Sequence, residues 1–273
     1  MNILVSINYN YAEQFIILIR SILESNPQAN ITIYLLHSSL SNENITYFKY
    51  YIETPRCTIK AIHVDDEEFT NAPVRFHWSR EIYYRLLAPW VLPEEVNRIL
   101  YLDADIVVIN SLRELYDLDL GDYCLAAASH VSGSSYFIHS IRLQLPKGSY
   151  YINSGVMLMD LKKMRSLYDK DVILNFIEKR MHTLWMPDQD VISVLYGRHV
   201  LPLDTLLYNL DDWHFAISGR AIPKSRRINA IWVRNNTKII HYSGRNKPWN
   251  SKSHSELHQF YNDVKQNLKQ MTH

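Results

Sequence analysis

Apolar residues in the first hundred positions alternate between two spacings. A continuous apolar run at residues 1–7 predicts a buried strand, and apolar residues at helical spacing over 12–23 predict a helix. The same succession continues with predicted strands at 31–36, 58–64 and 98–102 and predicted helices at 41–52 and 80–87. Strands that alternate with helices are typical of an α/β fold with a parallel, doubly wound sheet.

The second half of the chain has a less regular pattern. Pro89 and Pro93 are expected to close the helix at 80–87. Beyond them we expect strands at 125–129 and 152–161, helices at 172–182 and 191–195, and a loop over the polar stretch 213–237. No repeat or linker interrupts the pattern. We therefore predict one domain over residues 1–250, followed by a polar, helical tail at 251–273.

Composition excludes several classes of protein. The 273 residues are 47% apolar and carry a formal net charge of +1, so no electrostatic field for nucleic acid is expected. Cys57 and Cys124 stand far apart and form neither a disulfide framework nor a zinc motif. The N-terminus lacks a signal-peptide pattern, and no apolar run reaches the length of a membrane span. The simplest expectation is a cytoplasmic protein, with contact at the membrane surface left open.

Two carboxylates directly follow the predicted strand at 98–102. Asp103 and Asp105 are separated only by Ala104, so in an extended chain both would project to one side. Oxygen ligands on one side suit a divalent ion that also binds phosphate oxygens. The alternative is a solvated turn. Because polar residues 8–10 also follow a strand, both segments could line one crevice at the carboxyl edge of the sheet.

Three further polar motifs are candidates for chemistry. His241 follows an apolar run and could complete a metal site, while Gly244 and Lys247 downstream suit a phosphate; the alternative is a loop with a capping histidine. Residues 188–190, Asp-Gln-Asp, open a predicted helix, where an acidic cap is the alternative. The polar break at 151–155 could equally be a simple turn.

Taken in order, these motifs resemble the family 8 glycosyltransferases, which include bacterial lipopolysaccharide α-galactosyltransferases and, more distantly, glycogenin. The resemblance runs from Asn10-Tyr11 through Tyr84-Arg85-Leu86 and the Asp103-Ala104-Asp105 motif to His241-Tyr242-Ser243-Gly244 and Lys247-Pro248-Trp249. It implies a GT-A fold, a Rossmann-like mixed sheet flanked by helices. It also implies Mn²⁺-dependent transfer of a hexose from a UDP-sugar to a glycan or glycolipid acceptor, with retention of anomeric configuration.

The same resemblance implies a role for each matching position. Mn²⁺ would be bound by Asp103, Asp105 and His241. Asp188 and Gln189 would act in catalysis at the transferred sugar. The remaining positions would contact the donor, in order from uridine to diphosphate and sugar: Ser6, Asn8, Asn10, Tyr11, Ala104, Gly244, Lys247, Arg85, Asn153 and Ser154.

Two positions depart from the family pattern. The family commonly has aspartate where this chain has Asn8, and some relatives carry an acidic residue at the position of His130. Both departures bear on the choice of donor and acceptor. Because Gln189 is a poor nucleophile, we expect front-face attack, in which the leaving phosphate accepts the proton of the acceptor hydroxyl.

Two other functions fit part of the sequence. Residues 103–107 match the DxDx[TV] motif of haloacid-dehalogenase-type phosphohydrolases, in which Asp103 would be the nucleophile. That family places the motif on its first strand, whereas about a hundred residues precede it here, and a downstream GDxxxD is missing. A non-catalytic nucleotide-sugar-binding protein is the second alternative. No GxGxxG motif or P-loop is present.

Overall fold

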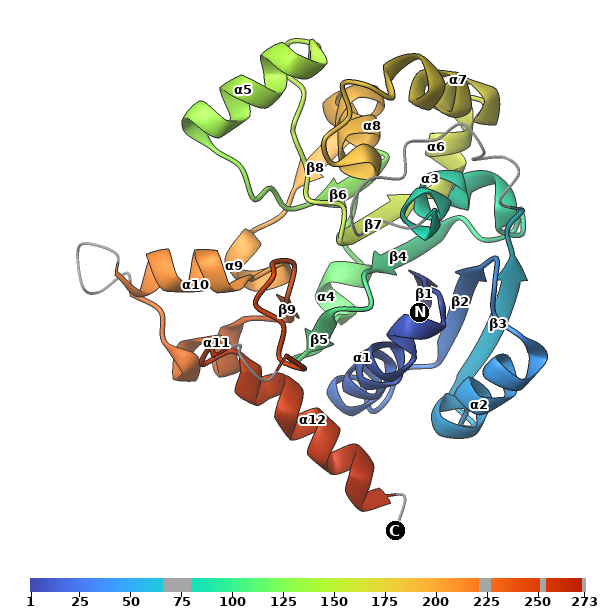
Figure 1. Cartoon of the computed structure of the whole chain (residues 1–273), viewed down its shortest axis with the longest axis vertical. Helices are drawn as coiled ribbons and strands as arrows, with labels where there is room; N and C mark the ends of the chain where they lie inside the picture. The colour runs from blue at the N-terminus through green and yellow to red at the C-terminus, as the bar shows by residue number, and fades with distance from the viewer. Residues whose placement is uncertain (66–79, 221–226, 251–253, 272–273) are drawn as a thin grey trace.

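The protein, seen in a computed structural model, is described over residues 1–65, 80–220, 227–250 and 254–271. Over these ranges one seven-stranded sheet has the order β3-β2-β1-β4-β7-β6-β8, and a two-stranded sheet pairs β5 with β9 (Figure 1). The strands are β1 (Asn2–Ser6), β2 (Ile31–His37), β3 (Cys57–His63), β4 (Arg98–Leu102), β5 (Ile106–Val108), β6 (Leu125–Ala127), β7 (Val156–Asp160), β8 (Val200–Pro202) and β9 (Ile239–His241).

The large sheet is mixed. Its first four strands are parallel, with β1 between β2 and β4. Strand β7 then runs antiparallel to both β4 and β6. The mixed, helix-flanked sheet is therefore confirmed, while the purely parallel sheet expected from alternation is wrong. Alternation of strands and helices gives the order of the elements along the chain. It does not show at which end of the sheet each strand begins, and so it does not give strand direction.

Helices cover both faces of the sheet, and β1 shows how the sequence divides them. Ile3 and Val5 pack in one buried cluster with α1 (Ala12–Ser25) and α2 (Asn42–Ile52), whereas Leu4 between them packs in another with α3 (Glu81–Val91). In the described part of the first two hundred residues, the remaining helices are η1 (Tyr9–Tyr11), α4 (Arg113–Tyr116), α5 (Gly133–Leu143), α6 (Leu161–Leu167), α7 (Lys170–Arg180), α8 (Pro187–Leu195) and η3 (Gly197–His199).

The C-terminal third forms a layer of helices around β9, of which all but the last are short. These are α9 (Thr205–Tyr208), α10 (Asp212–Gly219), α11 (Ala230–Asn236) and α12 (His258–Met271). The loop expected over 213–237 is therefore wrong where α10 and α11 lie, while residues 221–226 fall outside the described ranges. Side chains of Asp211 and Asn229 cap the two helices by accepting backbone N–H groups. Each helix is too short for a clear apolar period.

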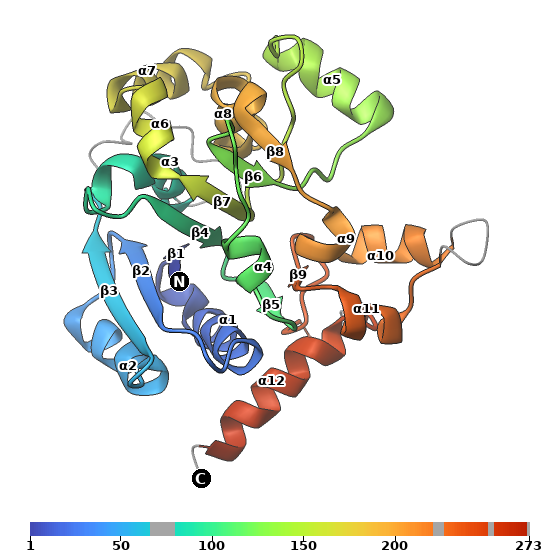
Figure 2. The ribbon, with the colours of Figure 1, turned by 180° about the vertical axis from the view of Figure 1, so that it is seen from behind.

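Helix α12 lies beside α1 at the edge of the molecule (Figures 1 and 2). Phe260 and Tyr261 are buried in a cluster that includes Ile17 of α1. Lys265 Nζ lies 2.6 Å from Glu13 Oε1. The polar tail thus contains a helix with one buried face; residues 251–253 and 272–273 of the tail fall outside the described ranges.

Two predicted boundaries are wrong in ways that matter for the site. Helix α3 continues through Pro89 to Val91, since a proline in the last turn removes only one backbone hydrogen bond. Strand β7 begins at Val156 and not at Ile152. The N–H groups of Ile152 and Asn153 donate instead to Ser193 Oγ and to the carbonyl of Ala128. The backbone at Ile152 and Asn153 therefore does not continue the β7 strand.

Candidate active site

The two-stranded sheet brings His241 to the Asp103-Ala104-Asp105 motif. The motif turns the chain from β4 into β5, and β5 pairs antiparallel with β9 so that Ile106 lies opposite His241. His241 Nε2 is 3.2 Å from Asp105 Oδ1 and 3.6 Å from Asp103 Oδ2. One ligand atom from each residue lies within 4.8 Å of the others. The sequence-predicted metal ligands therefore converge, although the motif is a turn and not an extended segment.

Asp103 is held so that one of its oxygens faces His241. The Tyr101 hydroxyl donates to Asp103 Oδ1 at 2.6 Å, and Arg85 Nη1 lies 2.9 Å from the same oxygen. The Arg85 guanidinium also stacks over the Tyr101 ring, 4.4 Å from its centroid. With Oδ1 engaged by both groups, Oδ2 is the oxygen available to a cation.

A chain of amides orients the ring of His241. The Gly155 N–H donates to Asn153 Oδ1, which identifies that atom as the amide oxygen. Asn153 Oδ1 also accepts from Asn209 Nδ2 at 3.0 Å, so the Asn209 oxygen must be the atom 2.8 Å from His241 Nδ1. Asn209 therefore holds a hydrogen on Nδ1 of His241, which is the outer contact that metal-bound histidines make, and leaves Nε2 as the nitrogen that a cation would bind.

Gly155 and Asn209 are two site residues that sequence reasoning missed. A Cβ on Gly155 would lie 2.2 Å from His241 Cε1 and 2.8 Å from Asp103 Oδ2, so only a hydrogen fits there. Asn209 is fully buried. Gly155 could have been found as the last residue of the polar break at 151–155. No sequence signal marks Asn209.

Lys247 pairs directly with Asp105 in this structure. Its Nζ lies 2.5 Å from Asp105 Oδ2. Burial alone would raise the pKa of Asp105, but His241 and Lys247 together hold it well below its usual range. Lys247 was expected to neutralise a phosphate; here it neutralises a carboxylate of the cation site.

Arg85 joins the cation site to the start of α8. Its Nη1 lies 3.1 Å from Asp188 Oδ2, which also accepts a 2.7 Å hydrogen bond from Ser154 Oγ. Burial raises the pKa of Asp188, although Arg85 and Ser154 oppose the shift. Gln189 is buried next in sequence. Arg85, Asp188 and Ser154 thus form one connected group beside Asp103.

The contacts of Asp190 indicate a structural role. It is fully buried, accepts from the backbone N–H groups of Trp185 and Met186 and pairs with Arg142 of α5 at 2.8 Å. Of the Asp-Gln-Asp motif, Asp188 thus lies with the candidate site and Asp190 does not. The capping alternative therefore holds for Asp190.

The predicted nucleotide contacts lie where β1 ends. Ser6 closes β1, and its hydroxyl lies 3.3 Å from that of Tyr101. Asn8 caps the short helix η1, which contains Asn10 and Tyr11. Burial raises the pKa of Tyr11, and the charge of Asp105 adds to the increase. The Tyr11 ring therefore lies near the Asp103-Ala104-Asp105 motif. Ala104 is nearly buried within the motif itself.

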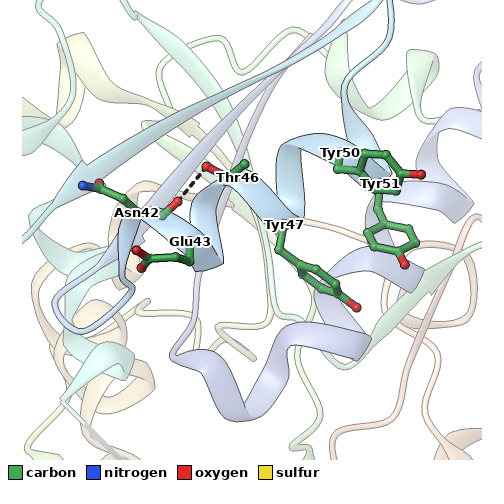
Figure 3. Close-up of a pocket in the computed structure, with 6 residues that line it drawn as sticks. All are labelled: Asn42, Glu43, Thr46, Tyr47, Tyr50 and Tyr51. Atoms are coloured by element: carbon green, nitrogen blue, oxygen red, sulfur yellow. Dashed lines mark hydrogen bonds between the residues drawn. The ribbon is translucent and has the colours of Figure 1, made fainter.

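A separate open depression of about 570 Å³ lies on α2 (Figure 3). Glu43 is its only ionisable carboxylate, and no histidine lines it. Its lining is Asn42, Glu43, Thr46, Tyr47, Tyr50 and Tyr51. Lacking convergent charged groups, this depression does not compete with the carboxylate–histidine group as a catalytic site.

The donor set suits a divalent cation. Two carboxylate oxygens and one imidazole nitrogen converge, and a cation bonded to each at about 2.1 Å would place neighbouring ligands about 3 Å apart. The 3.2 Å separation of His241 Nε2 and Asp105 Oδ1 is close to that spacing. In the described part of the chain no helix is long and apolar enough to cross a membrane.

Comparison with known proteins agrees with this architecture. The lipopolysaccharide 1,2-glucosyltransferase of Escherichia coli is 31% identical over 91% of this chain and 73% of its own length. The lipopolysaccharide 1,3-galactosyltransferase of Salmonella typhimurium is 24% identical over 97% of this chain and 78% of its own. The galactosyltransferase LgtC, solved with donor and acceptor sugar analogues, superposes with a TM-score of 0.82 at 25% identity, covering 98% and 96% of the two chains.

These likenesses identify the fold as GT-A and the protein as a glycosyltransferase. The profile of one family, described as glycosyl transferase family 8, matches residues 2–253. The chain therefore belongs to glycosyl transferase family 8.

Proposed function

We propose that the enzyme transfers glucose or galactose from a UDP-sugar to a hydroxyl of a lipopolysaccharide or related cell-envelope glycan, with Mn²⁺ bound and the anomeric configuration retained. The convergence of Asp103, Asp105 and His241 beside the Arg85–Asp188 pair carries the proposal. The names of the Escherichia coli and Salmonella relatives support the acceptor class. We also propose that residues 1–250 form a single catalytic domain, and that the enzyme acts in the cytoplasm.

The charges of the site residues indicate a separate role for each. Bound Mn²⁺ would stabilise the negative charge that develops on the departing diphosphate. Lys247, released from Asp105, would add a second positive charge at the same phosphates. Arg85 would orient Asp188 through their 3.1 Å contact, placing that carboxylate toward the sugar.

The resemblance to family 8 implies retention, and the residues near the sugar favour front-face attack as its route. Asp188 is engaged by Arg85 and Ser154, and Gln189 is a poor nucleophile. Front-face attack, with the acceptor proton passing to the leaving phosphate, needs neither residue as a nucleophile. Proton NMR of the product should then show an α-anomeric coupling. A β-linked product would reject this part of the proposal.

The alternative functions fit the structure less well. A phosphohydrolase of that type carries its nucleophile after its first strand, but Asp103 follows the fourth strand in chain order. Membership of family 8 also argues against that chemistry. A binding protein without catalysis would show donor affinity without turnover.

One experiment tests the proposal. Purified enzyme is incubated with Mn²⁺ and a panel of UDP-sugars, and released UDP is measured beside phosphate released from a generic phosphate ester. We expect UDP release from UDP-glucose or UDP-galactose that Asp103→Asn abolishes. Phosphate release without UDP release, or donor binding without any UDP release, would overturn the proposal.

A further inference from the structure

A second group of metal-ligating side chains lies beside the proposed Mn²⁺ site. His130 follows β6, while Asp211 and His214 belong to the first turn of α10. One ligand atom of each lies within 4.8 Å of the others. The rings of His130 and His241 are 6.2 Å apart between centroids. The group is therefore adjacent to the first site and shares no ligand with it.

Asp211 is oriented by the helix that it caps. Its Oδ1 accepts the His214 N–H at 2.8 Å and lies 2.7 Å from His214 Nδ1. The three-residue spacing places both side chains on one face of the turn. Its second oxygen, Oδ2, points to His130 and lies 3.3 Å from Nδ1 of that ring.

The neighbours of His130 show which of its ring nitrogens faces the group. Nε2 lies 2.8 Å from the carbonyl oxygen of Asn209, which can only accept, so Nε2 carries a hydrogen. Nδ1 lies 3.3 Å from the Asn153 amide nitrogen and 3.3 Å from Asp211 Oδ2. Nδ1 is therefore the nitrogen of His130 that a cation in this group would bind.

The spacing of two of the ligand atoms fits a small cation. His130 Nδ1 and Asp211 Oδ2 are 3.3 Å apart. This separation is close to the edge of a tetrahedron with metal–ligand bonds of about 2.0–2.1 Å.

We propose that His130, Asp211 and His214 bind a second divalent cation, of the borderline class represented by Zn²⁺. Two imidazoles and one carboxylate are a donor set that zinc accepts, and three protein ligands leave a fourth position open. The N–H of His130 that donates to a carbonyl matches the outer contact of metal-bound histidines. The three side chains are 13%, 14% and 19% exposed, which gives an ion access from solvent.

Asn209 would connect the two cations. Its carbonyl oxygen accepts from His130, and its side-chain oxygen accepts from His241. One buried residue thus orients a ligand of each site. An ion at the second site would restrain Asn209, and through it the imidazole that faces the Asp103-Ala104-Asp105 motif.

Zinc counting tests the proposal independently of sugar transfer. The full chain carrying Asp103→Asn and Asp105→Asn, which removes two ligands of the first site, is stripped with chelator and dialysed against Zn²⁺. Retained zinc is measured by mass spectrometry. We expect one zinc per chain, lost when His214→Gln is added and kept when His182→Gln is added. His182 is exposed and serves as the matched control.

Two results would overturn the proposal. One is an absence of stoichiometric zinc in the Asp103→Asn, Asp105→Asn background. The other is equal zinc in the presence and absence of His214→Gln. Circular dichroism melting of each variant shows whether the protein is folded during dialysis. If His214→Gln does not fold, Co²⁺ absorption of the His214-containing background protein decides, since a tetrahedral site gives a strong visible band and a solvated ion does not.

Discussion

Gly155→Ala tests whether backbone, and not only side chains, shapes the cation site. The new Cβ would lie 2.2 Å from His241 Cε1 and 2.8 Å from Asp103 Oδ2. Carbon atoms in contact are normally about 3.5–4.0 Å apart, so the imidazole would have to retreat by about 1.3 Å or more. Displacement of a reacting group by about 1 Å costs on the order of 100-fold in rate.

The expected result follows from that displacement. Turnover should fall about 100-fold, and Mn²⁺ affinity measured by calorimetry should fall about 10-fold or more. Overpacking should cost about 1–3 kcal/mol, a decrease of several degrees in Tm. The matched control is Gly219→Ala, whose Cβ would meet its nearest atom, the Ile228 carbonyl oxygen, at an ordinary 3.5 Å. Unchanged turnover and Mn²⁺ affinity in Gly155→Ala would refute the reasoning.

Four other outcomes are expected. EDTA should abolish UDP release and Mn²⁺ restore it in wild type but not in Asp103→Asn, and full activity in EDTA would count against a cation. Asp188→Ala should lower turnover while calorimetric Mn²⁺ affinity stays unchanged; an equal loss of affinity would make it a metal ligand. Asn209→Ala should weaken Mn²⁺ binding about 10–100-fold, because His241 Nδ1 loses its hydrogen-bond acceptor. Unchanged Mn²⁺ affinity would show that Asn209 does not orient His241. Amides of 242–248 should gain hydrogen-exchange protection only when UDP and Mn²⁺ are added together; equal protection in the free and bound protein would indicate a preformed site.

The elements nearest the N-terminus were the most predictable. Strands β1 to β4 and their helices have long apolar periods, since each is buried on at least one face. The short helices α10 and α11 were missed, because a helix of two turns is defined by its caps and by tertiary contacts more than by periodicity. Strand direction after β4 was also beyond the sequence pattern.

In the candidate site, too, some residues can be predicted from the sequence and others cannot. Asp103, Asp105 and His241 were expected together from the motif order and the family resemblance, and the β5–β9 pairing brings them into contact. Asn209 has no sequence signature, because a buried asparagine is recognised only by the atoms that it joins. Gly155 lies in the polar break at 151–155. The need for a glycine there depends on the His241 ring, which comes much later in the chain.

The Lys247–Asp105 pair bears on how tightly the proposed site would hold a cation. Lys247 Nζ contacts Asp105 Oδ2, whereas Oδ1 of the same carboxylate faces His241 Nε2. A cation at Oδ1 would therefore share the carboxylate with an ammonium group, and the two positive charges would repel each other. A diphosphate that draws Lys247 away from Asp105 would remove that repulsion, so the donor and the cation would each favour binding of the other.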